Sequence, residues 1–304
     1  MKKLFLLTLL ITVALPALGM SGNAAAAEKP NVRSNYILIF QATEYDSKIG
    51  DAIDFFFKKI LKPEDHLSII TPVNPYNFSP QTRQTYPIEK LIERTKDVLK
   101  RDITIGVANY QQILANMMQL VRDISGNMVS GADASASSST ALSSDLKSSL
   151  GQYRQLLENM RNLRKLNENL FMQLAGLFKK ETGKNYLYIF YQKELRIIPN
   201  PNALQRLVQS YEYKADATEL FESDRDEAFL NTETVGMALK DASVTLNFIY
   251  LNKSGKTGGG MEYKEFSGDV YNALSKLATA TGGFAETTSK PEAALKNAIE
   301  NAKK

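Results

Sequence analysis

Four short and almost uninterrupted apolar runs constrain what this chain can fold into more than any other feature. They span residues 36–40, 66–71, 186–191 and 243–251. Strands that are apolar on both faces are typical of a parallel sheet covered by helices on both sides. Helical patterns alternate with these runs along the chain. We therefore predict an α/β fold with a doubly wound, mostly parallel sheet.

Helical periodicity follows the first strand and returns near the end of the chain. Apolar residues four, three and four apart predict a helix over residues 47–61, and they are Ile49, Ile53, Phe56 and Ile60. Further helices are expected over residues 270–280 and from about residue 291. Between them, Gly282 and Gly283 suit a helix end that turns through positive φ before a short strand near Phe284.

Residues 87–182 interrupt the α/β pattern with two long helical stretches. Apolar residues recur there at alternating steps of three and four, a 3.5-residue repeat that lets two helices wrap around each other. The repeat comprises Leu99, Ile103, Gly106, Tyr110, Ile113, Met117, Leu120 and Ile124, then Tyr153, Leu156, Met160, Leu163, Asn167, Leu170, Leu174 and Leu177. A Ser-, Ala- and Gly-rich stretch, 126–144, predicts a flexible tip. We expect an antiparallel coiled-coil hairpin that projects from the α/β domain.

The first 27 residues have the pattern of a secretory signal peptide. Lys2 and Lys3 precede an apolar run over 4–18, and alanines at 24–27 precede Glu28. An uncleaved membrane anchor is the alternative, although the run is shorter than the roughly 20 residues of a spanning helix. The chain has no cysteine, hence neither a disulfide nor a lipid-attachment thiol. We predict a bacterial periplasmic or secreted protein, with a split α/β domain at 28–86 and 183–304 around the insertion.

Charge and composition argue against several kinds of function. The formal net charge is +4, far from the basic excess of a nucleic-acid binder. With one histidine and no cysteine, a Ser-His nucleophile pair would have to use His66, and cysteine metal clusters are excluded. Ser254-Gly255-Lys256-Thr257 lacks the preceding glycine and following helix of a phosphate-binding loop. We predict no catalytic residue, no metal and no cofactor.

Three short segments resemble the von Willebrand factor A-type domain family. The first is the strand-to-helix junction Gln41-Ala42-Thr43-Glu44-Tyr45, where the family carries Asp-x-Ser-x-Ser. The second is the run over 63–70, PEDHLSII, which is similar to a helix-end aspartate followed by the second strand. The third is the run over 269–283, which ends in Ala-x-x-Thr-Gly-Gly. Their order and spacing agree with the family over both flanks of the insertion.

The resemblance implies a domain that binds protein ligands, often through a divalent cation at the carboxyl ends of the strands. The junction here departs from the metal motif, since Gln replaces Asp, Thr replaces the first Ser and Tyr replaces the last. The second acidic ligand position falls on Gln192-Lys193, where a lysine would repel a cation. The resemblance thus implies a degenerate metal site. Candidate ligand-binding residues are Gln41, Thr43, Glu44, Tyr45, Gln192 and Glu194; alternatively, they cap strands and fill the vacated site.

These features favour a non-enzymatic interaction protein, with the α/β domain as a platform and the hairpin as a docking arm. Its partner is expected to be an unidentified protein in the cell envelope or outside the cell. One alternative is a self-assembling scaffold in which the helical repeats pair between chains. Another is a hydrolase that uses acidic residues. If the hairpin is modular, removal of residues 87–182 should leave a folded domain.

Overall fold

The computed structural model describes residues 33–130, 136–164, 166–209, 213–222, 229–255 and 261–301, without the side chains of residues 127–130, 136–143 and 301. Residues 33–304 form one compact unit. The predicted signal peptide at 1–27 and the second half of the expected loop at 254–257 lie outside the described residues. Within the described part, no helix combines the length and hydropathy needed to cross a bilayer.

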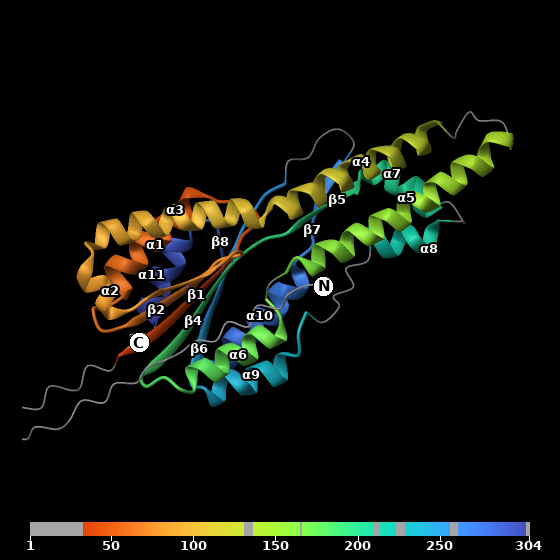
Figure 1. Cartoon of the computed structure of the whole chain (residues 1–304). Coiled ribbons are helices and arrows are strands. Elements are labelled where there is room, and N and C mark those ends of the chain that lie inside the picture. Colours follow the sequence, from red (N-terminus) through yellow and green to blue (C-terminus); the bar gives the residue numbers. More distant parts are fainter. Residues whose placement is uncertain are drawn as a thin grey trace, which may run out of the picture. The chain divides into compact units, whose positions relative to one another are not determined.

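A six-stranded sheet lies at the centre of the fold (Figure 1). Its order is β3-β2-β1-β4-β6-β8, and every neighbouring pair is parallel except β2 and β3. The strands are β1 (Ser34–Gln41), β2 (His66–Ile70), β3 (Pro75–Phe78), β4 (Lys184–Gln192), β6 (Val244–Leu251) and β8 (Ala285–Thr288). The prediction of an α/β fold with a mostly parallel sheet is confirmed. The antiparallel edge strand β3 was not expected.

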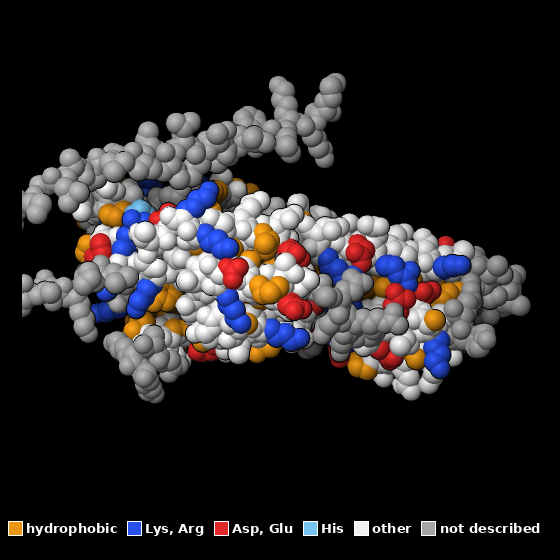
Figure 2. Space-filling view, turned by 90° about the horizontal axis from the view of Figure 1, so that it is seen from below, with side chains coloured by type: hydrophobic (Ala, Val, Ile, Leu, Met, Phe, Trp, Pro, Cys, Tyr) orange, Lys and Arg blue, Asp and Glu red, His pale blue; other side chains and the backbone are white. Residues whose placement is uncertain are grey.

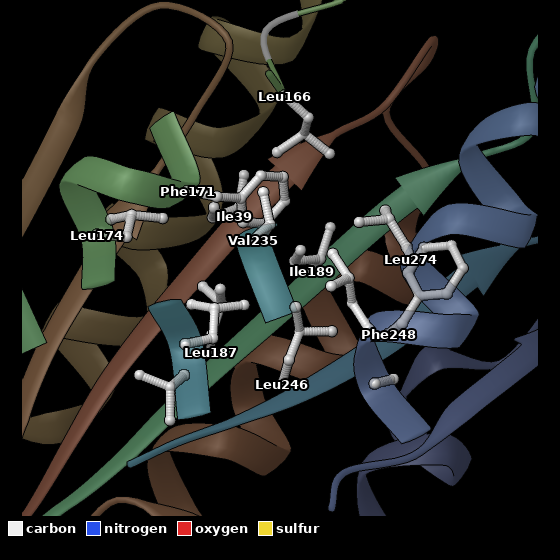
Figure 3. Close-up of a cluster of buried hydrophobic side chains, with 14 of the residues drawn as sticks. Ile39, Leu166, Phe171, Leu174, Leu187, Ile189, Val235, Leu246, Phe248 and Leu274 are labelled. Carbon is white, nitrogen blue, oxygen red and sulfur yellow. The ribbon is translucent and has the colours of Figure 1, made fainter. Parts of the chain in front are cut away.

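Helices cover both faces of this sheet. One face carries α1 (Ser47–Phe55) with its continuation η1 (Phe56–Ile60), α3 (Ile88–Gly106) and α11 (Pro291–Asn301). The other carries α6 (Glu168–Phe178), α9 (Thr232–Asp241) and α10 (Gly268–Ala280). Figure 3 shows side chains from this second layer, such as Phe171, Val235 and Leu274, meeting Leu187 and Phe248 of the strands. Burial on both sides explains why β4 and β6 are continuously apolar.

Local sequence signals set several element boundaries. Asp46 caps α1 by accepting a hydrogen bond from the backbone N–H of Lys48, so the helix starts where the apolar periodicity does. After α10, Gly282 has a φ of 74°, the left-handed turn predicted there. A Cβ on Gly283 would lie 1.8 Å from the carbonyl oxygen of Leu246. Only glycine lets this turn approach the sheet so closely.

A second group of elements, which we call the arm, packs around its own core. It consists of α4 (Ala108–Ser130), α5 (Ala136–Asn162), the antiparallel ribbon of β5 (Leu195–Pro199) and β7 (Met261–Glu265), α7 (Pro201–Gln209), α8 (Lys214–Ala217) and η2 (Thr218–Glu222). Its core includes Met117, Val121, Tyr153, Ile197 and Phe221. Figure 1 shows α4 and α5 running alongside each other with the ribbon next to α4.

Two buried tyrosines attach the helices of the arm to the ribbon. The hydroxyl of Tyr110 on α4 donates to the carbonyl oxygen of Leu195 at 2.9 Å and accepts from the N–H of the same residue at 2.9 Å. The hydroxyl of Tyr153 on α5 donates to the carbonyl oxygen of Ile197 at 2.8 Å. Burial raises the pKa of both phenols. These contacts satisfy β5 backbone groups that no neighbouring strand could reach.

The structure divides residues 87–182 differently from the predicted single hairpin. Helix α3 buries Leu99 and Ile103 against the sheet, and α6 buries Leu174 there. Only α4 and α5 pair with each other, and they also pack on the ribbon. Asn167, expected within the helical repeat, instead caps α6 by accepting from the N–H of Leu170 at 3.0 Å. Deletion of 87–182 would therefore strip a helix from each face of the sheet, so whether the remainder folds stays a prediction.

Two further expectations differ from the structure. The predicted flexible tip is helical up to Ser130 and again from Ala136, and residues 131–135 lie outside the described residues. Leu177, expected in the helical repeat, is 49% exposed. On the face drawn in Figure 2, basic and acidic side chains are interspersed, with hydrophobic ones scattered among them. Such a surface agrees with the modest net charge.

Candidate functional site

The centre of the sheet contains a topological switch point between β1 and β4. These strands are neighbours, but the chain continues from β1 toward β2 on one side and from β4 toward β6 on the other. In an open α/β sheet, the crevice outside the carboxyl ends of such strands is where ligands bind. Gln41 ends β1 and Gln192 ends β4. The switch point thus coincides with the junction singled out in the sequence.

The side chain of Gln192 lies at the switch point and contacts the turn after β1. Its amide oxygen accepts from the backbone N–H of Thr43 at 2.8 Å, from the Thr43 hydroxyl at 2.9 Å and from the N–H of Glu44 at 2.8 Å. Gln192 and Thr43 are 5% and 6% exposed. Buried polar groups persist when their hydrogen bonds are satisfied, as they are here. The amide therefore fixes the turn after β1.

A lysine supplies the positive charge at this point. Lys253 follows β6, and its ammonium lies 3.2 Å from the Thr43 hydroxyl oxygen and 3.1 Å from Glu44 Oε2. The lysine side chain is 15% exposed and the glutamate side chain is 51% exposed. The Gln111 amide on α4 also donates to the carbonyl oxygen of Thr43 at 3.4 Å. Three distant segments therefore converge on the turn after β1.

Two other candidate residues do not join this group. Gln41 lies opposite Tyr191 in the strand register, and among the described residues its side chain makes no hydrogen bond. Tyr45 lies over α1, with its hydroxyl 3.1 Å from the position of a Cβ on Gly50. Burial, with Asp51 nearby, raises the pKa of its phenol. Tyr45 thus packs against a helix rather than lining the crevice.

Glu194 belongs to a separate, buried charge cluster. Its Oε2 accepts from Arg164 at 3.0 Å, and its Oε1 accepts from the Tyr191 hydroxyl at 2.5 Å. Arg164 also contacts Asp269 Oδ2 at 2.5 Å and donates to the carbonyl oxygen of Phe266 at 2.8 Å. Arg164 and Glu194 are each 5% exposed. This cluster joins the segment between α5 and α6 to the ends of β4 and β7.

Burial controls the electrostatics of the charge cluster. It raises the pKa of Glu194, although the nearby Arg164 guanidinium opposes the shift. Burial raises the pKa of the Tyr191 phenol too, and the Glu194 charge adds to that effect. The second carboxylate oxygen of Asp269, Oδ1, is buried without a hydrogen-bond partner among the described residues. Arg164 has a structural role, because its removal would leave the buried Glu194 carboxylate and the mostly buried Asp269 carboxylate without a counter-charge.

The lysine expected to oppose a cation makes a different contact. Lys193 reaches Glu265 Oε2 on β7 at 2.8 Å, and Glu265 Oε1 accepts from the Tyr250 hydroxyl at 2.6 Å. The positive charge beside Thr43 comes instead from Lys253, which sequence reasoning missed. Arg164 and Gln111 were missed too. In the sequence, only their location pointed to them: Gln111 lies within a helix of the insertion, and Arg164 lies directly beside one.

The chemistry available at the switch point is that of hydrogen bonding and charge. His66 begins β2 and pairs in register with Asn35, at the amino ends of the strands and so at the opposite edge of the sheet. Within the described ranges, no group of three or more His, Asp or Glu side chains is placed to hold a metal ion. Glu44 remains the exposed carboxylate at the crevice. No family model, curated protein or solved structure matches this chain.

Proposed function

We propose that this chain is an exported, non-enzymatic interaction protein, with a von Willebrand A-like α/β platform, no functional metal site and an arm that meets a protein partner. If the six strands of the sheet are renumbered 1 to 6 in chain order, their order across the sheet is 3-2-1-4-5-6. This is the strand order of a doubly wound fold. The switch point of that order falls on the junction that resembles the family. These two observations support the choice of platform.

The filled crevice is the observation that carries the proposal. Gln192 and Lys253 contact the groups that a ligand at the switch point would use. A divalent cation placed beside Thr43 would be repelled by an ammonium already within 3.2 Å of its hydroxyl. Binding at the centre of the sheet would thus require the protein to break its own contacts. We infer that the partner binds elsewhere, on the arm.

The arm offers a suitable surface for a protein partner. Its exposed side carries amide and carboxylate side chains paired at i and i+4, such as Gln112 with Asn116, Gln119 with Asp123 and Gln155 with Asn159. These groups can exchange their mutual hydrogen bonds for bonds to a partner. Gln111 and Tyr110 connect the same helix to the switch point and to the ribbon.

Self-assembly through the helical repeat is less well supported. Met117, Val121 and Ile124 of α4 and Leu150 and Tyr153 of α5 are buried within a single chain. The apolar seam that would pair two chains is thus already occupied. Light scattering tests this point, because a monomeric mass would exclude assembly and a stable oligomer would favour it.

A capture experiment tests the proposed interaction. The full chain is cross-linked in the cell that exports it, beside one variant with Gln112→Ala, Gln119→Ala and Gln155→Ala and another with Glu44→Ala and Lys253→Ala. The first variant changes only exposed side chains of the arm and leaves its core intact. We expect a specific partner to be lost with the first variant and kept with the second. Loss with the second alone would place the site at the crevice, and absence of any specific partner would refute the proposal.

Two further measurements test export and metal binding separately. The mass of the chain recovered from the exporting cell should correspond to a start at Glu28, and an intact amino terminus would refute signal cleavage. Titration of the recovered chain with Mg²⁺ or Mn²⁺ should give no saturable binding, because Lys253 occupies the crevice. Saturable binding that Glu44→Ala abolishes would restore the metal-dependent alternative.

A further inference from the structure

A groove lies between the edge strand β3 and helix α3, and none of its lining residues belongs to the strands of the switch point. It has a volume of about 540 Å³ and is lined also by α2 (Pro80–Thr85) and by Ile69 of β2. Its apolar walls include Phe78, Leu91 and Leu99. Cavities of a few hundred to a thousand cubic ångströms with mostly apolar walls are typical of small-molecule sites. The groove therefore has the size and lining to hold a single small ligand.

All the charged side chains that line the groove are basic. They are Lys90, Arg94 and Arg101 of α3, and no acidic residue is among the described residues of the lining. Glu89 and Glu93 lie one position before Lys90 and Arg94, and Asp97 lies one position before Val98, so these acidic residues follow a neighbouring stripe of the helix. Helix α3 thus separates its charges and turns the positive stripe toward the groove.

Two of these cations are available to a ligand. Lys90 and Arg94 are exposed, and neither forms an ion pair with any residue in the described part of the chain. They stand four positions apart, where like charges on a helix repel each other. Lys96, by contrast, pairs with Asp54 at 2.7 Å. An anion bound in the groove would turn this local repulsion into attraction.

The third cation is held in a fixed orientation. Asp102, with a fully buried side chain, contacts Arg101 at 2.9 Å, and the Tyr76 hydroxyl accepts from Arg101 at 2.8 Å. Tyr76 donates in turn to Asp102 Oδ2 at 2.7 Å. A guanidinium has five N–H donors, so several remain for a ligand. Asp102 balances the charge of Arg101, which leaves Lys90 and Arg94 to supply the net positive potential.

From this arrangement we propose that the groove binds a small amphiphilic anion, namely an aromatic or short acyl group that carries one carboxylate, sulfonate or phosphate. The apolar part packs on Phe78, Leu91 and Leu99, and the anionic head lies by the basic stripe of α3. Arg101 supplies directional hydrogen bonds to that head. The site is independent of the arm and of the switch point, so a test of this site does not depend on the proposed protein interaction.

Fluorescence titration with two matched probes tests the proposal. One is 8-anilinonaphthalene-1-sulfonate, and the other is N-phenyl-1-naphthylamine, which has the same ring system without the sulfonate. The full chain should bind the sulfonate saturably with one site. We expect the double variant Lys90→Glu and Arg94→Glu to weaken that binding by roughly tenfold or more, since each lost charged contact contributes about that factor. The uncharged probe should bind more weakly and respond little to the double variant.

A matched control separates local charge from net charge. Lys59→Glu with Lys100→Glu changes the net charge equally but alters exposed lysines that do not line the groove. This control should bind the sulfonate like the native chain. Equal loss in both double variants, or no loss in either, would overturn the proposal. Chemical-shift changes in a ¹⁵N-labelled chain provide a second readout, and changes confined to regions other than β3 and α3 would also refute it.

Discussion

Helices α3 and α4 follow each other along the chain and carry one apolar repeat, yet they pack into different parts of the molecule. Leu99 and Ile103 of α3 lie in the core beneath the sheet, whereas Met117 and Val121 of α4 lie in the core of the arm. The change occurs at Gly106, the last residue of α3, and Val107, which alone separates the two helices. A periodic pattern determines which face of a helix is buried but not which element covers it.

The junction between these helices explains how the change of partner is possible. A Cβ on Gly106 would lie 2.4 Å from Cβ of Pro72, in the turn between β2 and β3. The missing side chain lets that turn lie against the end of α3, and the Val107 N–H still donates to the Ile103 carbonyl oxygen. Figure 1 shows α4 leaving the sheet along nearly the same direction as α3. The arm is thus an extension of a helix that belongs to the α/β core.

The largest expected effect concerns the charge cluster that joins the two regions. Arg164→Leu should lower the free energy of unfolding by about 3–5 kcal/mol, because the buried Glu194 and the mostly buried Asp269 would lose their counter-charge. Arg154→Leu is the matched control, since its ion pair with Asp216 is exposed and should contribute less than about 1 kcal/mol. Urea unfolding measures both. Equal losses would mean that the cluster does not stabilise the junction.

Core truncations on the two helices should separate the regions. Leu99→Ala and Met117→Ala each remove a fully buried side chain and should cost about 2–5 kcal/mol. Hydrogen exchange should then increase mainly in the sheet for the first variant and mainly in the arm for the second. Identical exchange patterns would show that the two cores unfold as one unit, which would contradict their division into two regions.

Overpacking of the helix junction should have a smaller effect. Gly106→Ala places a methyl group against Pro72 and should cost about 1–3 kcal/mol. In α5, a Cβ on Gly151 meets nothing within 4 Å, so Gly151→Ala should instead stabilise the chain by up to about 1 kcal/mol. Thermal unfolding of both variants checks the opposite signs. A neutral Gly106→Ala would show that the turn can move away at no cost.

The smallest effect is a pH dependence restricted to the α/β core. Burial, with Arg33 nearby, lowers the pKa of His66, the chain's only histidine. The unfolded chain therefore binds the proton more readily, so stability should fall as the pH drops through about 6.5, the ordinary histidine value. Hydrogen exchange near β2 should show this loss and the arm should not. His66→Gln should abolish it, and a slope that survives the substitution would assign it to other groups.

Much of the α/β core could be predicted from sequence because its signals are local. The apolar runs at β1, β2, β4 and β6 indicated buried parallel strands, and the helices after them carried clear periodicity. The strands β5 and β7 could not be found in this way, because they pair with each other and are far apart in the sequence. Strand β5 also ends in Pro199, and β7 ends in Glu265. Strand β3 is only four residues long and begins with proline.

The candidate site was predictable only in part. Thr43, Glu44 and Gln192 follow strands that lie side by side, so their proximity follows from a parallel sheet. Glu194, two residues beyond Gln192, belongs to another cluster because the chain turns there into β5. Lys253 and Arg164 are far away in sequence from the groups they contact. No local pattern encodes such long-range pairs.

The sequence by itself determined the fold class and the buried faces of the helices, because both depend on the type and spacing of neighbouring residues. Only the tertiary structure decided that α3 and α6 cover the sheet, that α4 and α5 build the arm with a ribbon, and that Lys253 supplies the charge at the switch point. Those outcomes depend on which buried surfaces meet, and several partners satisfy the same apolar pattern equally well.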